Sequence, residues 1–278
     1  MADPKSSIAA SAPGAASMIC EAHVQRWLRG QTKQEIDRLA EETPVALHYN
    51  GIPHVVMLAS PDSLEDLAVG FTWSEALVQS PHEIHSVHVR SVEEAMEINI
   101  GVTAQRFSEL LRLQRNMSGR TGCGVCGART IAEAIRRPRP VAAAITLEAE
   151  ELHDNLQALE SHQPINAQTG GMHAAAWCLP GQGIRFVRED VGRHNALDKV
   201  IGALGRAGID PGTGYFLITS RASYEMVQKA ATVGVSLLAA VSAPTGLAVR
   251  LARDAGLTLV GFARAQQHVV YTHPQRLD

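Results

Sequence analysis

The spacing of apolar and polar residues differs between the first part of this chain and the part after Gly170. In the first part, the strand-like runs Val45 to Tyr49 and His54 to Ala59 flank Asn50-Gly51, a pair that favours positive φ and a tight hairpin turn. From Asp62 to Val78 the apolar residues recur at helical spacing, so a helix should pack one face on this hairpin. The other elements predicted here are a polar helix near Gln25 to Leu39, strands at His85 to Arg90 and Ala95 to Ile100, and a helix at Thr103 to Leu113.

After Gly170 the chain alternates between short apolar runs and amphipathic stretches. Strands that alternate with helices of this length imply a largely parallel sheet covered on both faces. The predicted strands are His173 to Cys178, Ile184 to Val187, Tyr215 to Thr219, Leu237 to Val241, Leu257 to Phe262 and an edge strand at His268 to Tyr271. The helices predicted in this part are Arg193 to Leu204, Tyr224 to Val233 and Leu247 to Asp254, and a further helix, Leu147 to Leu159, is predicted before Gly170.

These patterns predict an α/β protein with two domains. Residues 1–24 should form a disordered tail, and residues 25–114 a small N-terminal α+β domain. Residues 115–278 should form the larger α/β domain, with a mostly parallel sheet.

Composition narrows the class of protein. Of the 278 residues, 45% are hydrophobic and 19% are charged, with a formal net charge of -3, so the chain is neither a disordered polyelectrolyte nor a general nucleic-acid binder. Met1 to Ser17 lacks the basic and apolar stretches of a secretory signal, and the apolar runs further on are too short to cross a bilayer. Four cysteines are too few for a disulfide framework. We therefore expect a cytoplasmic protein without a membrane span.

A glycine-rich loop, Thr121 to Gly127, carries the sharpest chemical signal, the pair Cys123 and Cys126. A thiol reacts as the thiolate, and its pKa falls beside cations or at a helix N-terminus. Arg120 and Arg129 flank the loop, so both cysteines are candidate catalytic residues. The neighbouring glycines lack a Cβ, which gives a large partner access to the sulfur.

The same spacing also fits two other kinds of site. A structural zinc pair needs two further ligands, for which His173 and His194 are candidates, because Cys178 ends an apolar strand and Cys20 lies in the predicted tail. A thioredoxin-like dithiol would need a strand-to-helix placement that this loop lacks. Zinc remains an alternative to redox or sulfur chemistry.

Three strand-to-helix turns carry the second signal: Glu189 to Asn195, Thr219 to Ser223 and Ser242 to Gly246. In a parallel sheet such turns meet at the carboxyl edge, where unpaired backbone N–H groups can bind phosphate. Arg193 and Arg221 would add charge-assisted hydrogen bonds to an anionic, nucleotide-like ligand. Ordinary helix capping explains any one of these turns equally well.

Charged and polar residues near the first turn have two interpretations. Asp190 and Asp198, close to Arg193 and Lys199, are interpreted as ion-pair partners that hold the turn, in preference to acid–base roles. His173 either faces the ligand site or completes a hydrogen bond at a strand end.

Taken together, these residues resemble the formate dehydrogenase accessory sulfurtransferases, the FdhD/NarQ family. The matching segments are Glu42-Thr-Pro-Val45, Asn50-Gly51, Leu67-Ala-Val-Gly-Phe71, Thr121-Gly-Cys-Gly-Val-Cys-Gly127, Thr169-Gly-Gly-Met-His173, Glu189-Asp-Val-Gly-Arg-His-Asn-Ala-Leu-Asp-Lys199, Thr219-Ser-Arg221 and Gly261-Phe-Ala-Arg264. The cysteine loop and the long segment that ends at Lys199 are the specific ones.

The resemblance implies a fold, an activity and a set of partners. It implies a cytidine-deaminase-like larger domain, a homodimer, and a sulfurtransferase that accepts persulfide sulfur from a cysteine desulfurase. The sulfur would pass to the bis-molybdopterin guanine dinucleotide form of the molybdenum cofactor, which formate dehydrogenase needs. The family's persulfide cysteine corresponds to Cys123, with Cys126 assisting, and no permanent metal is expected. Its cofactor-binding stretch corresponds to Phe262, Ala263, Arg264, Ala265, Gln266 and Gln267.

Both lines of reasoning give one hypothesis, in which a thiolate at Cys123 carries sulfur to a cofactor whose phosphates lie at the sheet edge. Two alternatives stay open: a zinc-dependent deaminase, which would need a His-x-Glu or Cys-x-Glu pattern, and a chaperone that binds the cofactor without chemistry. The cofactor-binding residues predicted outside the C-terminal stretch are Arg193, His194, Thr219, Arg221 and His173.

Overall fold

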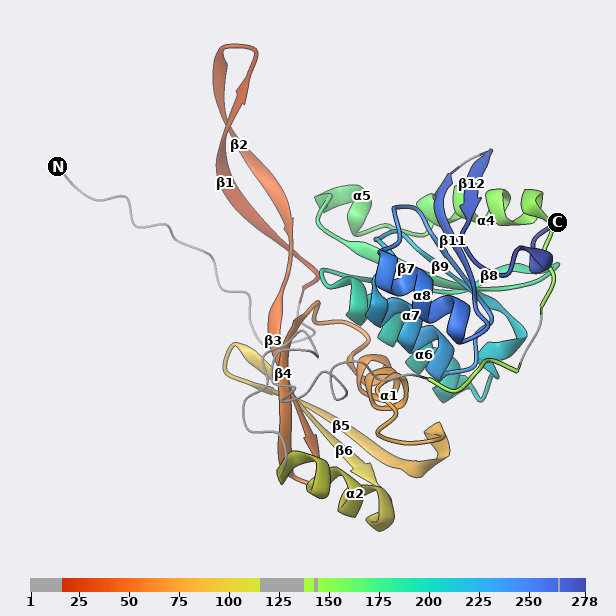
Figure 1. Cartoon of the computed structure of the whole chain (residues 1–278). Coiled ribbons are helices and arrows are strands. Elements are labelled where there is room, and N and C mark those ends of the chain that lie inside the picture. The colour runs from red at the N-terminus through yellow and green to blue at the C-terminus, as the bar shows by residue number, and fades with distance from the viewer. Residues whose placement is uncertain (1–16, 116–137, 143–144, 265) are drawn as a thin grey trace.

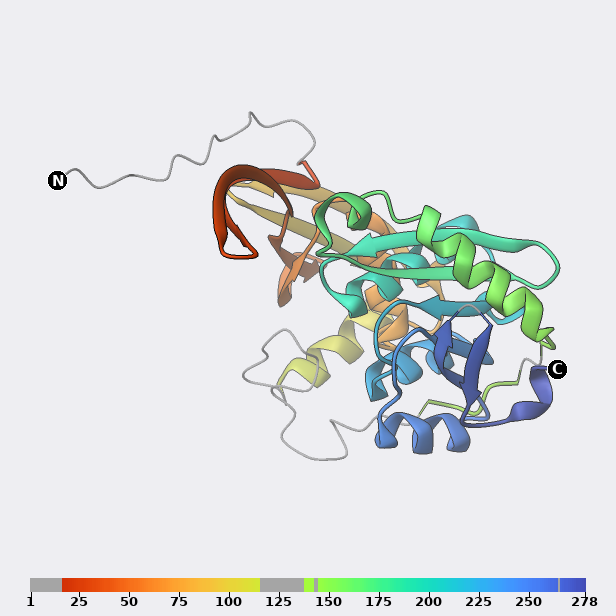
Figure 2. The ribbon, with the colours of Figure 1, turned by 90° about the horizontal axis from the view of Figure 1, so that it is seen from above.

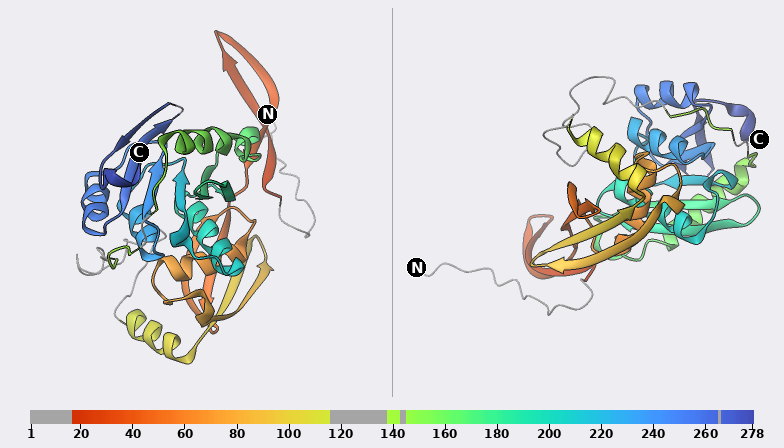
Figure 3. Two further views of the ribbon diagram at one scale, coloured as in Figure 1. Left: turned by 90° about the vertical axis from the view of Figure 1, so that its right-hand side faces the viewer. Right: turned by 90° about the horizontal axis from the view of Figure 1, so that it is seen from below.

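The computed structural model of this chain describes residues 17–115, 138–142, 145–264 and 266–278. Within this part the strands form sheets of two, four and six strands. Figure 1 shows the two-stranded sheet as a projecting arm, with the four-stranded sheet below it and the six-stranded sheet with its helices to one side. The views from above, from the side and from below confirm that the arm stands clear of the six-stranded sheet along most of its length (Figures 2 and 3).

The arm consists of β1 (Ile19–Leu28) and β2 (Gln31–Ala40), which pair antiparallel along their whole length. Two predictions are therefore wrong: β1 begins inside the predicted 1–24 tail, and the predicted helix near Gln25 to Leu39 is a hairpin. Side chains alternate between half-buried and exposed along the first half of β1, which is a strand period. The turn residues Arg29 and Gly30 have φ values of 49° and 83°, as a tight hairpin requires. The strand period is hard to recognise in the sequence, because many residues of this hairpin are polar.

The four-stranded sheet has the order β4-β3-β6-β5. The predicted hairpin at Asn50-Gly51 is confirmed, with both residues at positive φ. Helix α1 buries Leu67 and Ala68 against Val45 and Leu47 of this sheet, as the sequence predicts. The elements are β3 (Thr43–Tyr49), β4 (Ile52–Ala59), α1 (Leu64–Ser74), η1 (Pro81–Glu83), β5 (Ile84–Val92), β6 (Ala95–Val102) and α2 (Ala104–Arg115).

The six-stranded sheet has the order β12-β11-β10-β9-β7-β8 and is mixed. Only β9, β10 and β11 run parallel, whereas β7 pairs antiparallel with β8 and β9, and β12 pairs antiparallel with β11. The prediction of a mostly parallel sheet is wrong for this reason: short turns join β7 to β8 and β11 to β12, and a parallel pair needs a long crossover. The strands are β7 (His173–Leu179), β8 (Gly183–Asp190), β9 (Tyr215–Ile218), β10 (Leu237–Ala240), β11 (Thr258–Arg264) and β12 (Gln267–Val270).

Helices cover both faces of this sheet, as predicted. Ala175 and Trp177 of β7 pack with α6, α7 and α8 on one face, whereas Ala174 and Ala176 pack with α4 on the other. This strict alternation makes β7 apolar on both sides, the pattern of a fully buried strand. The helices are α4 (Ala149–Ser161), α5 (Asn166–Thr169), α6 (Arg193–Ala207), α7 (Tyr224–Thr232) and α8 (Gly246–Asp254), with short turns η2 (Pro211–Thr213) and η3 (Pro274–Arg276).

Helices α1 and α6 cross in close contact and join the two larger sheets. A Cβ at Gly70 would lie 1.7 Å from the carbonyl oxygen of Asp198, and a Cβ at Gly202 would lie 1.8 Å from that of Asp66. Both positions therefore require glycine for the backbones to approach. The division at residues 114 and 115 and the likeness to a cytidine-deaminase fold stay predictions.

Candidate functional site

The predicted catalytic pair, Cys123 and Cys126, lies outside the described residues, as do Arg120 and Arg129. Of the cysteines that the structure describes, Cys178 is fully buried, and burial raises its pKa to about 12. Burial and the neighbouring Glu41 also raise the pKa of Cys20. Neither described thiol therefore has the lowered pKa that a sulfur nucleophile requires.

The predicted phosphate-binding turns do meet at one edge of the six-stranded sheet. Strands β9, β10 and β11 end at this edge, β7 starts there, and β8 ends beside β7 with His173 opposite Asp190. Backbone hydrogen bonds join neighbouring turns: Thr245 N–H donates to Ala222 O (3.0 Å), and Phe262 N–H donates to Ser242 O (3.2 Å). The turns thus form a continuous rim, even though the sheet is only partly parallel.

Thr219 locks the first part of this rim to β7. Its backbone N–H donates to Ala174 O (3.0 Å), and its hydroxyl oxygen accepts from Ala174 N–H (2.9 Å). The Thr219 side chain is therefore already occupied by the protein, whereas Arg221, two residues further on, is exposed. Of these two predicted residues, Arg221 is the one with a side chain available to an anion.

Helix α6 brings Arg193 and His194 to the rim, because Gly192 caps it at the end of the β8 turn. His194 Nε2 lies 2.9 Å from Glu225 Oε2 in the first turn of α7. Arg193 Nε is buried and makes no hydrogen bond to any described residue. A buried donor without a partner is costly, so this atom is one that a ligand could satisfy.

Burial and charged neighbours shift the pKa values of two side chains at the rim. Burial lowers the pKa of His173, and the positive charges of Arg193 and His194 lower it further, against the opposing effect of Asp190. Burial acts to raise the pKa of Glu225, but His194 and Arg193 outweigh it and hold the pKa below its usual range. Glu225 is therefore ionised at neutral pH, and His173 is neutral.

A buried ion pair supports the β8–α6 turn from below. Asp190 accepts hydrogen bonds from Gly192 N–H (2.7 Å), Asn195 Nδ2 (2.9 Å) and Ser60 N–H (3.1 Å), and it pairs with Lys199 Nζ at 2.7 Å. Asp190 and Lys199 are both fully buried. This confirms the structural interpretation of Asp190, and it ties the turn to the corner between β4 and α1.

Asp198 also makes an ion pair, but with a residue that its local sequence does not suggest. Lys229 Nζ of α7 lies 2.9 Å from Asp198 Oδ2 and 2.8 Å from Glu75 Oε1 of the segment after α1. Burial acts to lower the pKa of Lys229, but Asp198 and Glu75 outweigh it, so the pKa is raised and the ammonium stays charged. This second pair holds α1, α6 and α7 together away from the rim.

The residues of the predicted C-terminal cofactor-binding stretch differ in how far their side chains are exposed. Phe262 is 41% exposed with a φ of 50°, and a register shift separates Gly261 from Arg264 in β11. Such backbone outliers gather at functional sites. Ala263, in contrast, is fully buried in the core on the α4 face, so its side chain is not available to a ligand. Ala265 lies outside the described residues, whereas Gln266 has a φ of 68° in the turn to Gln267.

Three residues of this site were missed by sequence reasoning: Ser60, Asn195 as a bridging residue, and Glu225. Asn195 Nδ2 donates to Leu58 O (2.8 Å) as well as to Asp190. Only Glu225 had a local signal, because acidic residues are favoured in the first turn of a helix. The other two bridge segments far apart in sequence, which a single sequence does not reveal.

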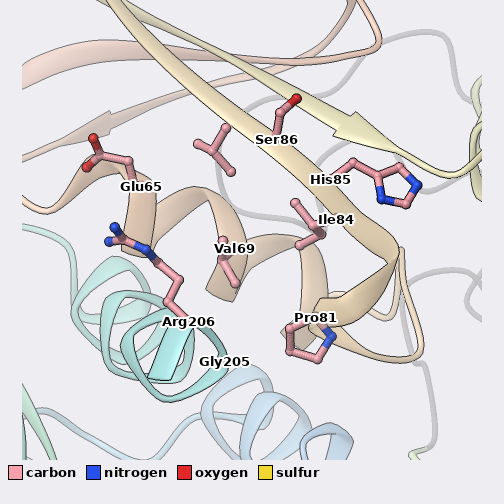
Figure 4. A pocket seen from close by; sticks show the side chains of 9 residues that line it. Glu65, Val69, Pro81, Ile84, His85, Ser86, Gly205 and Arg206 are labelled. Carbon is pink, nitrogen blue, oxygen red and sulfur yellow. The ribbon is translucent and has the colours of Figure 1, made fainter. Parts of the chain in front are cut away.

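Two cavities in the described part of the chain lie away from this rim. One cavity of about 330 Å³ lies between α1, β5 and the end of α6, lined by Glu65, His85 and Arg206 (Figure 4). Another, of about 440 Å³, lies at the opposite end of β7, beside Trp177 and Phe186.

The described residues contain no group of three or more His, Cys, Asp or Glu that could hold a metal ion. None of the described helices is long and apolar enough to cross a membrane.

Comparisons with known proteins all point to one protein family. A model of the FdhD/NarQ family matches residues 40–278. The sulfur carrier protein FdhD of Xanthomonas campestris pv. campestris (strain B100) is 49% identical over 92% of this chain and 91% of its own length. The sulfur carrier protein FdhD of Cupriavidus necator (strain ATCC 17699) is 47% identical over 92% of this chain and 88% of its own.

A solved structure shows that the fold is shared as well. The crystal structure of a protein from Desulfotalea psychrophila, described as a formate dehydrogenase accessory protein, matches with a TM-score of 0.74 at 21% identity. The match covers 94% of this chain and all of that one. The family model and the relatives both extend over most of the sequence, and the chain therefore belongs to the FdhD/NarQ family.

Proposed function

We propose that this protein is a sulfur carrier that serves the maturation of formate dehydrogenase. The observation that carries the proposal is its likeness, over nine-tenths of both chains, to relatives named sulfur carrier protein FdhD. The specific donor would be a cysteine desulfurase, and the specific acceptor the bis-molybdopterin guanine dinucleotide cofactor. A cytoplasmic location and a homodimer belong to the same proposal.

Loading would begin at the Cys123 thiolate. It attacks the outer sulfur of the desulfurase persulfide, the S–S bond of that persulfide breaks, and the desulfurase cysteine leaves as a thiolate. Cys123 then carries the sulfane sulfur as its own persulfide. Cys126 would assist release by attacking Cys123 Sγ, which expels hydrosulfide and forms a Cys123–Cys126 disulfide. A thiol reductant would then reduce this disulfide back to the two thiols.

The rim of the six-stranded sheet would hold the cofactor that receives the sulfur. The N-terminal N–H groups of α6 and the side chains of Arg193 and Arg221 would bind its phosphates. The buried Nε of Arg193 without a partner supports this role. Phe262 would offer an exposed aromatic ring on which a guanine base can stack.

Binding of the nucleotide part is testable without the whole cofactor. GDP carries the same base and diphosphate, so titration calorimetry with GDP should show binding that Arg193→Ala weakens. The matched control is Arg185→Ala, on β8 but at the end of the strand away from the rim. Equal weakening by both substitutions, or no GDP binding at all, would remove the rim from the proposal.

Sulfur transfer is testable in cells. Cys123→Ala should abolish formate dehydrogenase activity in cells that lack their own copy of the protein, whereas Cys20→Ala should leave it unchanged. If Cys123→Ala restored full activity, the protein would be a cofactor chaperone that works without its loop cysteines. Purified protein with stoichiometric zinc would instead favour a structural site or a deaminase-like enzyme.

A further inference from the structure

The cavity of about 440 Å³ at the end of β7 opposite the rim has no part in the proposed function. Its volume lies within the range of about 300–1,000 Å³ that is typical of small-molecule sites. The described residues that line it are mainly apolar, with one threonine and one cation: Trp177, Leu179, Ile184, Phe186, Ile209, Thr213 and Arg185. An apolar cavity with one charged group in its lining suits an amphipathic small molecule.

Trp177 gives this cavity a fixed apolar wall. It is 2% exposed, and its indole Nε1 donates to Pro211 O at 3.0 Å. A Cβ at Gly214 would lie 2.5 Å from Trp177 Cε2, so only glycine leaves room for the ring. The ring of Phe186 lies beside it, with the ring centroids 6.3 Å apart. A wall that is already ordered loses little conformational entropy when a ligand binds.

Apolar surface remains accessible beside this wall. Leu179, Phe186 and Ile209 are only partly buried, and they pack against the core cluster that contains Trp177. Burying apolar surface that is in contact with water is favourable. The apolar part of a ligand would therefore be stabilised here.

Arg185 is the charged residue of the cavity, and a β-bulge sets its position. The pairing of β7 with β8 shifts register between Trp177 and Cys178, and Arg185 is the residue of β8 left without a partner in β7. A bulge re-aims a side chain relative to the regular alternation of a strand. Arg185 is exposed, and its side chain makes no hydrogen bond or ion pair with any residue in the described ranges.

The free charge of Arg185 differs from that of another arginine on the same strand. Arg188 Nη2 lies 2.7 Å from Asp66 Oδ2, so its charge is balanced within the protein. A guanidinium without such a partner can bind a carboxylate through two parallel hydrogen bonds. A single cation balances a single negative charge, which favours a carboxylate over a dianionic phosphate.

From these observations we propose that the cavity binds an amphipathic carboxylate, a molecule with an aromatic or aliphatic body and one carboxyl group. The body lies against Trp177, Phe186 and Ile209, and the carboxylate accepts hydrogen bonds from the Arg185 guanidinium. The site lies at the end of β7 away from the rim, so this ligand and GDP bind independently. The inference goes beyond the proposed sulfur transfer and does not depend on it.

Titration calorimetry on the full-length protein tests this proposal, with phenylbutyrate and octanoate as probes. Both acids should bind, and phenylbutyramide, which has the same body without the charge, should bind more weakly. Arg185→Gln should raise the dissociation constant of phenylbutyrate by about tenfold, to that of the amide, because a hydrogen bond between charged groups is lost. Ile209→Ala should weaken the acid and the amide alike, because it removes apolar contact.

A matched control removes the same charge elsewhere: Arg253→Gln, at an exposed position of α8, should leave the binding of both acids unchanged. Saturating GDP should not displace phenylbutyrate, and circular dichroism should show each variant folded. Four results would each overturn the proposal: neither acid binds, the amide binds as tightly as its acid, Arg185→Gln keeps full affinity, or GDP displaces phenylbutyrate.

Discussion

Replacing Lys199 by methionine should destabilise the protein strongly. The Lys199 ammonium lies 2.7 Å from Asp190 Oδ2 and 2.9 Å from Asp62 Oδ1, and it donates to Ser60 O at 3.1 Å. Neither Lys199 nor Asp190 is exposed to solvent. Lys199→Met therefore leaves the Asp190 carboxylate buried without its cation, whereas Asp62, which is partly exposed, regains water.

Breaking a buried ion pair by removing one partner costs about 3–5 kcal/mol. Lys199→Met should lower the free energy of unfolding by this amount, measured from urea unfolding curves followed by tryptophan fluorescence. Asp190→Asn combined with Lys199→Met removes both charges and should recover much of the loss, because an amide still accepts from Gly192 N–H. A loss below about 1 kcal/mol for the single substitution would refute this reasoning, since surface ion pairs already account for that much.

The same substitution also tests the link between this pair and the rim. Lys199→Met should weaken GDP binding, because Asp190 positions the start of α6. Lys229→Met breaks the comparable Asp198 pair away from the rim, so it should cost similar stability but leave GDP affinity nearly unchanged. Comparing the two dissociation constants at a temperature where both variants are folded separates positioning from general destabilisation.

Three further outcomes are expected. Arg193→Ala should raise the GDP dissociation constant by roughly tenfold to a hundredfold in calorimetry, because a hydrogen bond to a charged group contributes about 1.5–3 kcal/mol. The lowered folded pKa of Glu225 means that its stabilising contribution is present above the unfolded value and is lost as the pH falls through the folded value; Glu225→Gln should flatten that acid limb in melting temperature against pH. Gly70→Ala should lower the melting temperature markedly, because its Cβ would overlap the Asp198 carbonyl in the contact between α1 and α6.

The sequence correctly predicted those helices, strands and turns whose conformation is set by a few neighbouring residues. The Asn50-Gly51 turn and the periodic apolar residues of α1 and β7 define their elements within a few neighbouring residues. Part of the arm was mispredicted as a disordered tail and the rest as a helix, because its strand period is carried by half-buried residues such as Val24 and Glu35 among exposed polar ones. The direction of β7 was also beyond local reading, since it depends on which strand it pairs with.

The candidate site shows the same limit. Arg193 and Arg221 were predicted as anion ligands because cations at turns after strands are a recognisable pattern, and their role as ligands stays a prediction. The roles of Ser60 and Asn195 were not predicted, because their partners lie 130 and 137 positions away in the chain. Ala263 shows a related limit: the resemblance assigns a contiguous segment to the ligand, whereas strand alternation turns this side chain into the core.

The transfer of sulfur to Cys123 can be measured directly. The protein is incubated with a cysteine desulfurase and cysteine, and the peptide that contains Cys123 is weighed by mass spectrometry without reductant. This peptide should gain the mass of one sulfur atom and lose it again on treatment with dithiothreitol, while the peptide with Cys178 stays unchanged. A peptide that never gains sulfur, while a control acceptor in the same tube does, would contradict it.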